Sequence, residues 1–331
     1  MSDLAVIINS YNRKPLLEAA LQTLFEALGR VPEAWVVIVF EAGSTDGSRE
    51  YLNQEVLRRP PGALQVVMAD ATEDTGFSSG VNEAWQHAIR RHPKLRWLLL
   101  YETDNQIESS QPLRHGLQLL RQQTNLGAVG FTVRKGDGSP AGYGCPFPTG
   151  WHFILGPQFS CRLGFDRPRV KQAGEVEGSA WWFCDVVYSS PILIRRECWE
   201  QSGGFDARYF PFADCDVDWA WRANKLGWRQ AVIQTRAVIH DNQARLSNWS
   251  ANRALRFHQA RFAYLARTRG RAAHLLKPAL WVRHLFEFGA LSCVAGLRPS
   301  LRPLAKQKWD LMRSVWRGYE PKSPQNNRRL T

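Results

Sequence analysis

The chain has 331 residues, of which 44% are hydrophobic and 22% are charged, and these ordinary values exclude disordered and fibrous proteins. That length allows two domains. The formal charge of +13 is concentrated at one end, because 18 of the 43 basic residues but only 3 of the 30 acidic residues follow residue 244. The sequence therefore predicts a nearly neutral body followed by a strongly cationic C-terminal extension.

The lack of targeting signals and the scattered cysteines predict a cytoplasmic protein. The N-terminus lacks the basic-then-apolar pattern of a signal peptide. The most apolar run, 285–297, is interrupted by Glu287 and is too short to cross a membrane, so we expect no membrane span. The six cysteines show no C-x-x-C spacing, which argues against a disulfide framework and against a zinc site.

The first 135 residues alternate between strand-like and helix-like patterns. Leucine and alanine recur at three- and four-residue spacing from Leu16 to Leu28, which predicts one apolar helix face. Strands alternating with helices predict an α/β fold with a mostly parallel sheet, whose ligands bind beyond the carboxyl ends of the strands. The predicted strands are 4–8, 36–40, 64–68, 96–101 and 128–133.

The rest of the chain divides into an irregular segment, a second structured block and the cationic extension. Residues 136–177 are rich in Gly, Pro and aromatics, and they predict a partly ordered excursion over the active face. The second block predicts strands at 186–194 and 231–239 and a helix at 217–226. Basic segments with Trp and Phe predict helices beyond residue 245, and we expect the last dozen residues to be disordered.

The loops after the first two predicted strands indicate the class of ligand. Loop 9–13 contains no glycine, which argues against a dinucleotide-binding enzyme, and the sequence has no Walker A motif. Glu41 ends the second strand and can accept the N–H of a pyrimidine ring, while the small residues of 42–48 let the backbone approach a nucleotide. The alternative is an ordinary turn that caps the next helix.

Two carboxylates follow the fourth predicted strand. Glu102 and Asp104 stand at positions i and i+2, where both can bind one hard cation such as Mg²⁺ and leave coordination positions for substrate phosphates. The alternative is a solvated acidic loop.

A third acidic cluster, the three aspartates of 214–218, precedes a predicted helix. A calcium-binding loop is excluded because Trp219 and Lys225 stand where that loop needs Gly and Glu. The remaining interpretations are helix capping, or a site where a bound cation or a proton relieves the repulsion. His240, at the end of a predicted strand, is either a metal ligand or a structural histidine.

Taken together, these motifs resemble those of the family 2 inverting glycosyltransferases of the GT-A fold, particularly the bacterial rhamnosyltransferase-like branch. The resemblance covers roughly residues 4–245 and implies a Rossmann-like, mostly parallel sheet flanked by helices, to which the basic helical extension is added. The matching segments are 6–13, 43–48, 76–82, 102–104 and 203–206, together with 216–218 followed by Arg222 and Gly227.

The resemblance implies a role for each candidate residue. Asp216 would be the general base, and Glu102 and Asp104 would hold Mg²⁺ or Mn²⁺ on the donor diphosphate, with His240 joining the metal site. The residues implied to bind the nucleotide are Ser10, Tyr11, Asn12, Glu41, Gly76 and Asn82, and those expected to bind the acceptor are Trp181, Trp182, Asp214 and Asp218.

Four positions depart from the family pattern. Glu41 replaces the usual Asp, Ala42 replaces the usual Asn, Glu102 occupies the first metal position, and Cys215 replaces the Glu of a Glu-Asp pair. A cysteine does not replace a carboxylate electrostatically, so we expect Asp214 to compensate. These departures keep open one alternative function, that of a catalytically degenerate scaffold protein.

The predicted activity is inverting, metal-dependent sugar transfer from a nucleotide diphosphate sugar, either dTDP-rhamnose-like or a UDP-sugar. The acceptor is a glycan or a lipid-linked glycan of cell-surface polysaccharide synthesis. We expect 1–135 to bind the nucleotide sugar, 136–244 to bind the acceptor and catalyse, and 245–331 to face a membrane or a partner. A sugar nucleotidylyltransferase is disfavoured because loop 9–13 is not Gly-rich.

The cationic extension has several interpretations. Arg and Lys interleaved with Trp and Phe suit an anionic membrane surface, which would place the protein peripherally at the inner face of the cell membrane. The same composition suits nucleic acid, but we expect no such partner because acids at several strand ends would repel phosphates. The other interpretations are a homo-oligomer contact and packing against the catalytic part.

Overall fold

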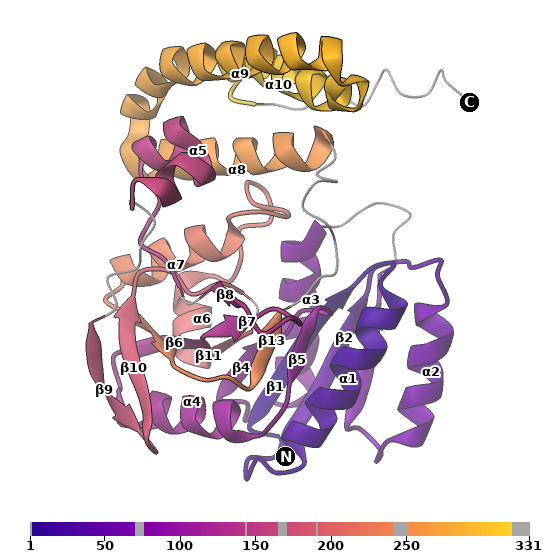
Figure 1. Ribbon diagram of the computed structural model, residues 1–331. Helices are drawn as coiled ribbons and strands as arrows, with labels where there is room; N and C mark the ends of the chain where they lie inside the picture. The colour runs from indigo at the N-terminus through magenta and orange to yellow at the C-terminus, as the bar shows by residue number, and fades with distance from the viewer. Residues whose placement is uncertain are drawn as a thin grey trace. The chain divides into compact units, whose positions relative to one another are not determined.

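The computed structural model describes residues 2–69, 76–142, 144–164, 171–189, 191–240 and 251–319 (Figure 1). It divides into two compact units, of which the first carries the β-sheets and the second is helical. Unit 1 consists of Met1–Phe147, Pro168–Pro211 and Cys215–Ala244, and unit 2 consists of Pro148–Arg167, Phe212–Asp214 and Arg245–Thr331.

Unit 1 is built on a nine-stranded mixed sheet with the order β3-β2-β1-β4-β11-β6-β12-β10-β9. The first four of these strands are parallel, β11 is antiparallel to both of its neighbours, and β12 is parallel to β6. The strands are β1 (Leu4–Ser10), β2 (Trp35–Glu41), β3 (Leu64–Met68), β4 (Trp97–Leu100), β6 (Leu126–Phe131), β9 (Gln172–Val176), β10 (Ser179–Cys184), β11 (Ile192–Arg195) and β12 (Arg229–Ile233).

Helices cover both faces of this sheet, and the central strands are therefore nearly continuous apolar runs. Leu4 and Val6 of β1 face a core that includes buried leucines of α1, α2 and α4. On the other face, Gly80 of α3 lies so close to β2 that a Cβ there would stand 2.6 Å from Phe40. The helices are α1 (Lys14–Leu28), α2 (Ser48–Arg58), α3 (Gly76–Arg91), α4 (Gln111–Gln122), α6 (Arg196–Ser202) and α7 (Cys215–Lys225).

A smaller sheet of four strands begins where β4 ends. Its order is β5-β13-β7-β8, and the antiparallel register of β13 against β5 places His240 opposite Asn105. The strand pair therefore brings a residue from the end of unit 1's sequence next to the acidic loop after β4. The strands are β5 (Asn105–Ile107), β7 (Val133–Arg134), β8 (Pro140–Gly142) and β13 (Val238–His240).

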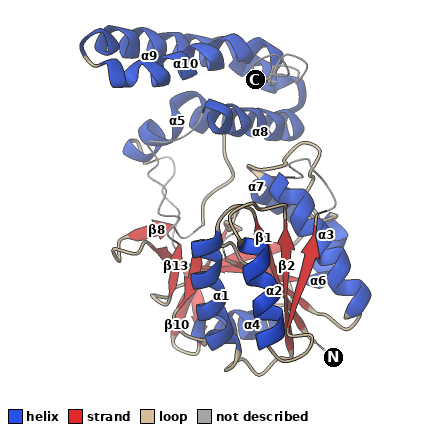
Figure 2. Cartoon of the chain, turned by 90° about the vertical axis from the view of Figure 1, so that its right-hand side faces the viewer, coloured by secondary structure: helices blue, strands red, loops and turns tan. Residues whose placement is uncertain are grey.

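The core of unit 2 is a cluster of aromatic rings. Phe153, His258, His284 and Tyr319 pack with ring centroids 5.1–6.0 Å apart, and the Tyr319 hydroxyl lies 3.1 Å from His284 Nε2. Figure 2 shows α9 and α10 of this unit side by side. Its elements are α5 (Gly150–Arg162), α8 (Ala251–Arg269), α9 (Lys277–Leu297) and α10 (Arg302–Ser314), with 3₁₀ turns at Gly270–Leu276, Pro299–Leu301 and Val315–Arg317.

The α/β prediction is confirmed, with differences in detail. The predicted strand 231–239 is two strands in different sheets, because the chain bends at 234–237, where Thr235 is joined to Thr132 by two hydrogen bonds. Only the end of 186–194 is a strand, and part of the irregular segment, 148–167, belongs to unit 2. The last dozen residues lie outside the described part of the chain.

One apolar stretch in unit 2 differs from the expectation that no segment could span a membrane. Within the helical run Arg253–Leu297, one stretch is long and apolar enough to cross a membrane by length and composition, and 17% of it is buried. The earlier criterion counted uninterrupted apolar residues, and Glu287 ended the count. Its carboxylate forms ion pairs with Arg283 and Lys308, at 3.0 and 2.7 Å.

Candidate active site

The carboxyl ends of β1, β2 and β4 form one edge of the large sheet. Ser10 ends β1 and is in register with Glu41, which ends β2, while the acidic loop follows β4 on the other side of β1. Ser10 is buried, and its hydroxyl has no hydrogen-bond partner among the described residues. The fold thus gathers the first, second and fourth strand-end loops, as the sequence predicts.

The Glu41 carboxylate binds its own loop. It is fully buried, it accepts the backbone N–H groups of Gly43 at 3.1 Å and Ser44 at 2.6 Å, and Arg49 lies 3.5 Å away. In this conformation Glu41 therefore orders the loop predicted to receive the nucleotide base. The longer Glu side chain reaches these amides, which are two and three residues further along the chain.

The neighbouring loop after β1 is tied to the same segment. Asn12 adopts a left-handed conformation (φ 50°) and accepts the backbone N–H of Thr45 at 2.7 Å, while its own N–H donates to Ser44 Oγ at 2.9 Å. Tyr11 stands beside it with 55% of its surface exposed. The structure therefore brings Asn12 and the 43–48 loop together and leaves Tyr11 open to a ligand.

Glu102, Asp104 and His240 lie close together at the end of β4. His240 Nδ1 is 3.5 Å from Asp104 Oδ1 and 3.0 Å from Asn105 Oδ1, and Arg13 donates to Asp104 Oδ2 at 3.0 Å. Burial raises the pKa of Glu102 to about 7, and the nearby Asp104 charge adds to the rise. Negative charge on both carboxylates at once is therefore unfavourable unless a cation compensates it.

These residues fit a divalent cation that is bound by few protein ligands. Asp104 is 6% exposed, yet its Oδ1 has no hydrogen-bond partner among the described residues, so one hard oxygen is buried and unsatisfied. In the described part of the chain, no group of three or more His, Cys, Asp or Glu side chains has the geometry of a complete metal site. Mg²⁺ is commonly bound by one or two carboxylates plus substrate phosphates, which suits this arrangement.

Ser189 connects the metal candidates to the predicted base. Its hydroxyl donates to Glu102 Oε1 at 2.8 Å, and its backbone N–H donates to Asp216 Oδ2 at 3.4 Å. Asp216 also accepts the Val217 N–H at 2.9 Å and lies in the first turn of α7. Sequence reasoning missed Ser189, which belongs to no motif. It also assigned no role to Arg13, although a basic residue in the loop after a strand could have been predicted to pair with a nearby carboxylate.

Asp214 and Asp218 are already paired. Within unit 2, Asp214 forms a two-pronged ion pair with Arg261, at 2.6 and 3.0 Å. Within unit 1, the fully buried Asp218 accepts Arg222 Nε at 2.8 Å, and the same guanidinium donates to the carbonyls of Ser202 and Gly204. Both carboxylates therefore have structural contacts in addition to the acceptor-binding role expected for them.

Cys215 does not supply a charge. Its thiol is buried, and burial together with the neighbouring Asp216 raises its pKa well above the ordinary value. The expected compensation by Asp214 is not seen, because that carboxylate lies on Arg261. Asp216 is therefore the carboxylate of this segment that hydrogen-bonds to Ser189.

The remaining candidates make contacts with other residues of unit 1. Asn82 holds the chain at Phe205 through two hydrogen bonds of 2.7 and 3.1 Å, and Gly76 begins α3 at φ 78°. Trp181 is buried in the core, with its ring against Phe183. Trp182 lines a cavity of about 840 Å³ together with residues of β7, β8 and the 234–237 bend.

A comparison with protein families decides the class. The family described as "Glycosyltransferase like family 2" matches residues 2–261 of the chain. The chain belongs to this family. This glycosyltransferase shares the GT-A fold with the solved structures to which it is similar, and the resemblance noted in the sequence is confirmed.

Three relatives of this family 2 member illustrate the similarity. It is 25% identical over 283 residues to an N-acetylglucosaminyl-diphospho-decaprenol L-rhamnosyltransferase of Mycobacterium tuberculosis, covering 80% of this chain and 84% of that protein. The mannosyltransferase PcManGT of Pyrobaculum calidifontis, solved with GDP-Man and Mn²⁺, has a TM-score of 0.55 at 18% identity, covering 96% and 86% of the two chains. S. aureus TarS has a TM-score of 0.53 at 14% identity, covering 96% and 81%.

Proposed function

We propose that this glycosyltransferase transfers a sugar, with inversion, from a nucleotide diphosphate sugar to a glycan or lipid-linked acceptor in cell-surface polysaccharide synthesis. The name of the mycobacterial relative favours a dTDP-rhamnose-like donor and a lipid diphosphate acceptor, with UDP-sugars as the second class of donor. The observation that carries the proposal is the buried, unsatisfied Asp104 oxygen next to Glu102 and His240.

Asp216 is the proposed general base. The helix dipole stabilises a carboxylate in the first turn of α7. Its oxygen would accept the proton of the acceptor hydroxyl while the hydroxyl oxygen forms a bond to C1 of the sugar. The bond from C1 to the diphosphate oxygen breaks with its electron pair, so one displacement on the opposite face inverts the anomeric centre.

Asp104 and Glu102 are the proposed ligands of Mg²⁺ or Mn²⁺, with His240 beside them. When bound, the cation would neutralise the charge that develops on the leaving diphosphate. The Mn²⁺ in the similar mannosyltransferase structure supports a divalent metal requirement. Ser189 would orient Glu102 through its 2.8 Å hydrogen bond.

The functional division of the chain follows the same proposal. Residues 1–135 would bind the nucleotide sugar, 136–244 would bind the acceptor and supply the base, and 245–331 would face a membrane or a partner. We place the reaction in the cytoplasm, at the inner face of the cell membrane. A degenerate scaffold is the second candidate, favoured by the neutral Cys215 and by a Glu41 carboxylate already bound to its own loop.

Nucleotide binding distinguishes the two candidates. Thermal unfolding of the full chain is measured with UDP, dTDP, GDP and CMP, each with and without Mg²⁺ or Mn²⁺. We expect one pyrimidine diphosphate to stabilise the protein only with metal, by about 2.7 kcal/mol at a hundred times its dissociation constant. The effect should disappear in Asp104→Asn and persist in Glu26→Gln, an exposed carboxylate of α1. Stabilisation by no nucleotide would overturn the transferase proposal in favour of the scaffold.

A further inference from the structure

The second half of α9 is an uncovered apolar surface. Residues 289–297 carry no charge, and Ala295 is the one buried side chain among them. Phe286 is 76% exposed and Leu297 is 87% exposed. Contiguous apolar surface of this kind marks a site of interaction with a membrane or a partner.

The neighbouring helix α10 presents cations beside that surface. Arg302, Lys306, Trp309 and Arg313 follow one another at spacings of four, three and four residues, so they share one helix face, and all four are exposed. Neither Arg302 nor Lys306 forms an ion pair with any residue in the described ranges, whereas Lys308 on the same helix is paired with Glu287. The face therefore offers positive charge that the described residues do not neutralise.

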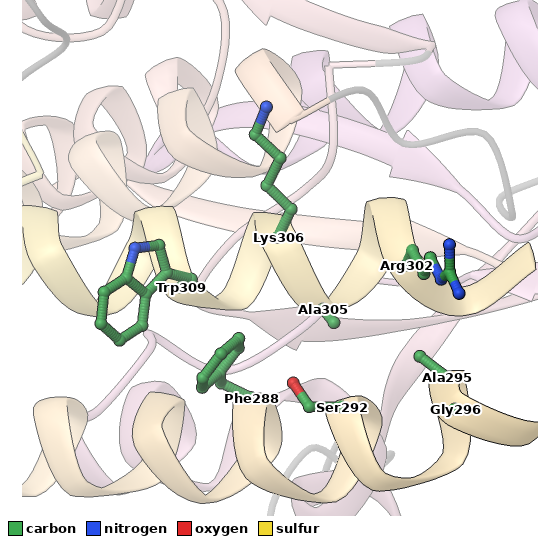
Figure 3. Close-up of a pocket in the computed structure, with 8 residues that line it drawn as sticks. All are labelled: Phe288, Ser292, Ala295, Gly296, Arg302, Ala305, Lys306 and Trp309. Carbon is green, nitrogen blue, oxygen red and sulfur yellow. The ribbon is translucent and has the colours of Figure 1, made fainter. Parts of the chain in front are cut away.

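A hollow of about 500 Å³ lies between the two helices (Figure 3). The rings of Phe288 and Trp309, with centroids 5.0 Å apart, close one end, and Arg302 stands at the other. Small residues of both helices, including Gly296 and Ala305, leave the space between them open. Lys306 extends from the rim of the hollow away from α9. The hollow is thus apolar at the end formed by Phe288 and Trp309, and it has one cation at its opposite end, Arg302, and another at its rim, Lys306.

We propose that this hollow binds an anionic phospholipid and that α9 and α10 lie in the surface of an anionic bilayer. Arg302 would pair with the phosphate of the lipid in the hollow, and Lys306 would pair with the surrounding anionic headgroups. Phe288 and Trp309 would contact the first part of an acyl chain, and Phe286 would enter the hydrocarbon region. The proposal deepens the proposed function by placing the enzyme where a lipid-linked acceptor resides, but lipid binding does not depend on the sugar-transfer reaction.

The polar contacts of α9 favour lying on the bilayer over crossing it. Arg283 donates to Glu287 at 3.0 Å and to the Phe153 carbonyl at 2.7 Å, and Glu287 also pairs with Lys308 of α10. A spanning α9 would carry this ion-pair cluster into the hydrocarbon region, where charged groups are costly. A helix in the interface keeps the cluster at the headgroups and buries only the apolar face.

Charge complementarity separates the bilayer from two other occupants. A second copy of the chain, docked symmetrically through this surface, would bring Arg302, Lys306 and Arg313 against the same cations. Nucleic acid would pair with the cations but would leave the apolar residues of α9 without a hydrophobic partner. An anionic bilayer supplies a charged layer directly above hydrocarbon, which matches both parts of the surface.

Vesicle co-sedimentation of the full chain tests the proposal. Vesicles of phosphatidylcholine alone are compared with vesicles containing phosphatidylglycerol, without donor, acceptor or metal. We expect binding to require phosphatidylglycerol. The double variant Arg302→Gln/Lys306→Gln should bind about 25-fold more weakly, since one basic residue near an anionic surface contributes about fivefold. The control Arg90→Gln/Lys94→Gln removes the same charge from exposed residues of unit 1 and should bind like the wild type.

Phe286→Ser tests the apolar contact, and it should weaken vesicle binding without changing its dependence on phosphatidylglycerol. Circular dichroism melting checks that each variant is folded. Equal weakening by the control pair, or unchanged binding by both the double variant and Phe286→Ser, would overturn the proposal. Displacement by inorganic phosphate at constant ionic strength would instead indicate a free-phosphate site. Self-association in sedimentation velocity that Phe286→Ser abolishes, with no vesicle binding, would indicate a contact between copies.

This experiment is separate from the test of sugar transfer. Nucleotide stabilisation depends on Asp104 in unit 1, and vesicle binding depends on Arg302, Lys306 and Phe286 in unit 2. A chain that binds vesicles but no nucleotide contradicts the proposed reaction alone. A chain that binds nucleotide but no vesicles contradicts the lipid site alone.

Discussion

Ser189 makes contact with two carboxylates that stand far apart in the sequence. Its hydroxyl holds Glu102 after β4, and its backbone N–H reaches Asp216 at the start of α7. Shortening the Ser189 side chain removes the hydrogen bond to Glu102 but keeps the backbone hydrogen bond to Asp216. A single residue therefore allows the proposed metal ligand and the proposed base to be perturbed separately.

Replacing Asp216 with Asn should remove the base while keeping the shape of the side chain. We expect kcat to fall by about 10²–10⁴-fold, because that is the usual contribution of a positioned general base. The dissociation constant of the nucleoside diphosphate should stay unchanged. Steady-state kinetics and thermal shift together check both statements, with Asp137→Asn in the exposed turn before β8 as the control. A kcat within threefold (roughly half a logarithmic unit) of wild type would exclude Asp216 as the base.

Replacing Ser189 with Ala should affect the metal site and leave the Asp216 contact in place. The loss of a 2.8 Å hydrogen bond frees Glu102 to rotate, so we expect the Mn²⁺ concentration for half-maximal activity to rise about tenfold. Saturating Mn²⁺ should restore most of kcat. A metal titration of activity measures this, and Ser300→Ala on the exposed surface provides the comparison. An unchanged metal requirement would contradict the role given to Ser189.

Sequence reasoning located the strand-end carboxylates but not their partners. Glu41, Glu102 and Asp104 are predictable because each follows an apolar run that reads clearly as a strand. Which of them is already hydrogen-bonded depends on loop conformation, and the Glu41 side chain turns to its own amides at Gly43 and Ser44. Ser189 is not predictable, since its meeting with Glu102 depends on tertiary packing over 87 positions of sequence.

At the scale of one element, α7 is fixed by a buried ion pair. Asp218 is fully buried on Arg222, and that guanidinium also reaches two carbonyls of the 202–204 turn. Because Asp216 precedes Asp218 by only two residues, the same pair sets the position of the proposed base. A sequence motif that looks catalytic therefore contains one residue whose contacts are structural.

Asp218→Asn should lower the free energy of unfolding by about 1.5–3 kcal/mol, because Arg222, which is 21% exposed and keeps its two carbonyl contacts, loses its charged acceptor. Glu200→Gln is the matched control: it breaks another i,i+4 pair, with Arg196, whose partners are 26% and 41% exposed, and should cost less than about 1 kcal/mol. Urea unfolding monitored by circular dichroism compares the two. Similar losses in both variants would contradict the structural role of Asp218.

Elements with a strong local pattern are the ones that sequence reasoning finds. The stripe from Leu16 to Leu28 and the apolar run 36–40 correspond to α1 and β2 within two residues at each end. The predicted strand 231–239 is wrong because it runs through three consecutive polar residues, 234–236, which lie between β12 and β13 where the chain passes from one sheet to the other. The antiparallel β11 within a mostly parallel sheet depends on pairing and not on propensity.

At the scale of the whole molecule, unit 2 has buried imidazoles in its core. Burial and, to a smaller extent, the neighbouring His284 lower the pKa of His258 to about 3. His284 is itself buried, with its pKa lowered for the same reason. Despite partial burial, the pKa of Glu287 is held far below the usual range by the nearby His284, Arg283 and Lys308. The contribution of Glu287 to stability is therefore lost only when the pH falls below the ordinary pKa of a glutamate.

Unit 2 should therefore lose stability as the pH falls below about 6.5, the pKa of His258 in the unfolded chain. Between that value and about 3 the unfolded state binds a proton that the folded state does not, which costs about 1.4 kcal/mol per pH unit. His258→Phe keeps an aromatic ring and should flatten this dependence. Urea unfolding at pH 7, 6 and 5 (roughly the onset of the histidine range) measures the slopes. Equal slopes in the variant and the wild type would contradict the prediction.

The second unit is assembled from three separate stretches of the chain, and this constrains how the protein could have evolved. Phe153 packs on His258 and Tyr319, and a side chain at Gly156 would collide with Arg283. A descendant that lost everything after residue 244 would keep an insertion whose apolar side had no counterpart. We therefore expect the 148–167 segment, the 212–214 stretch and the helices after residue 244 to be gained or lost together during evolution, as one module encoded by three stretches of the gene.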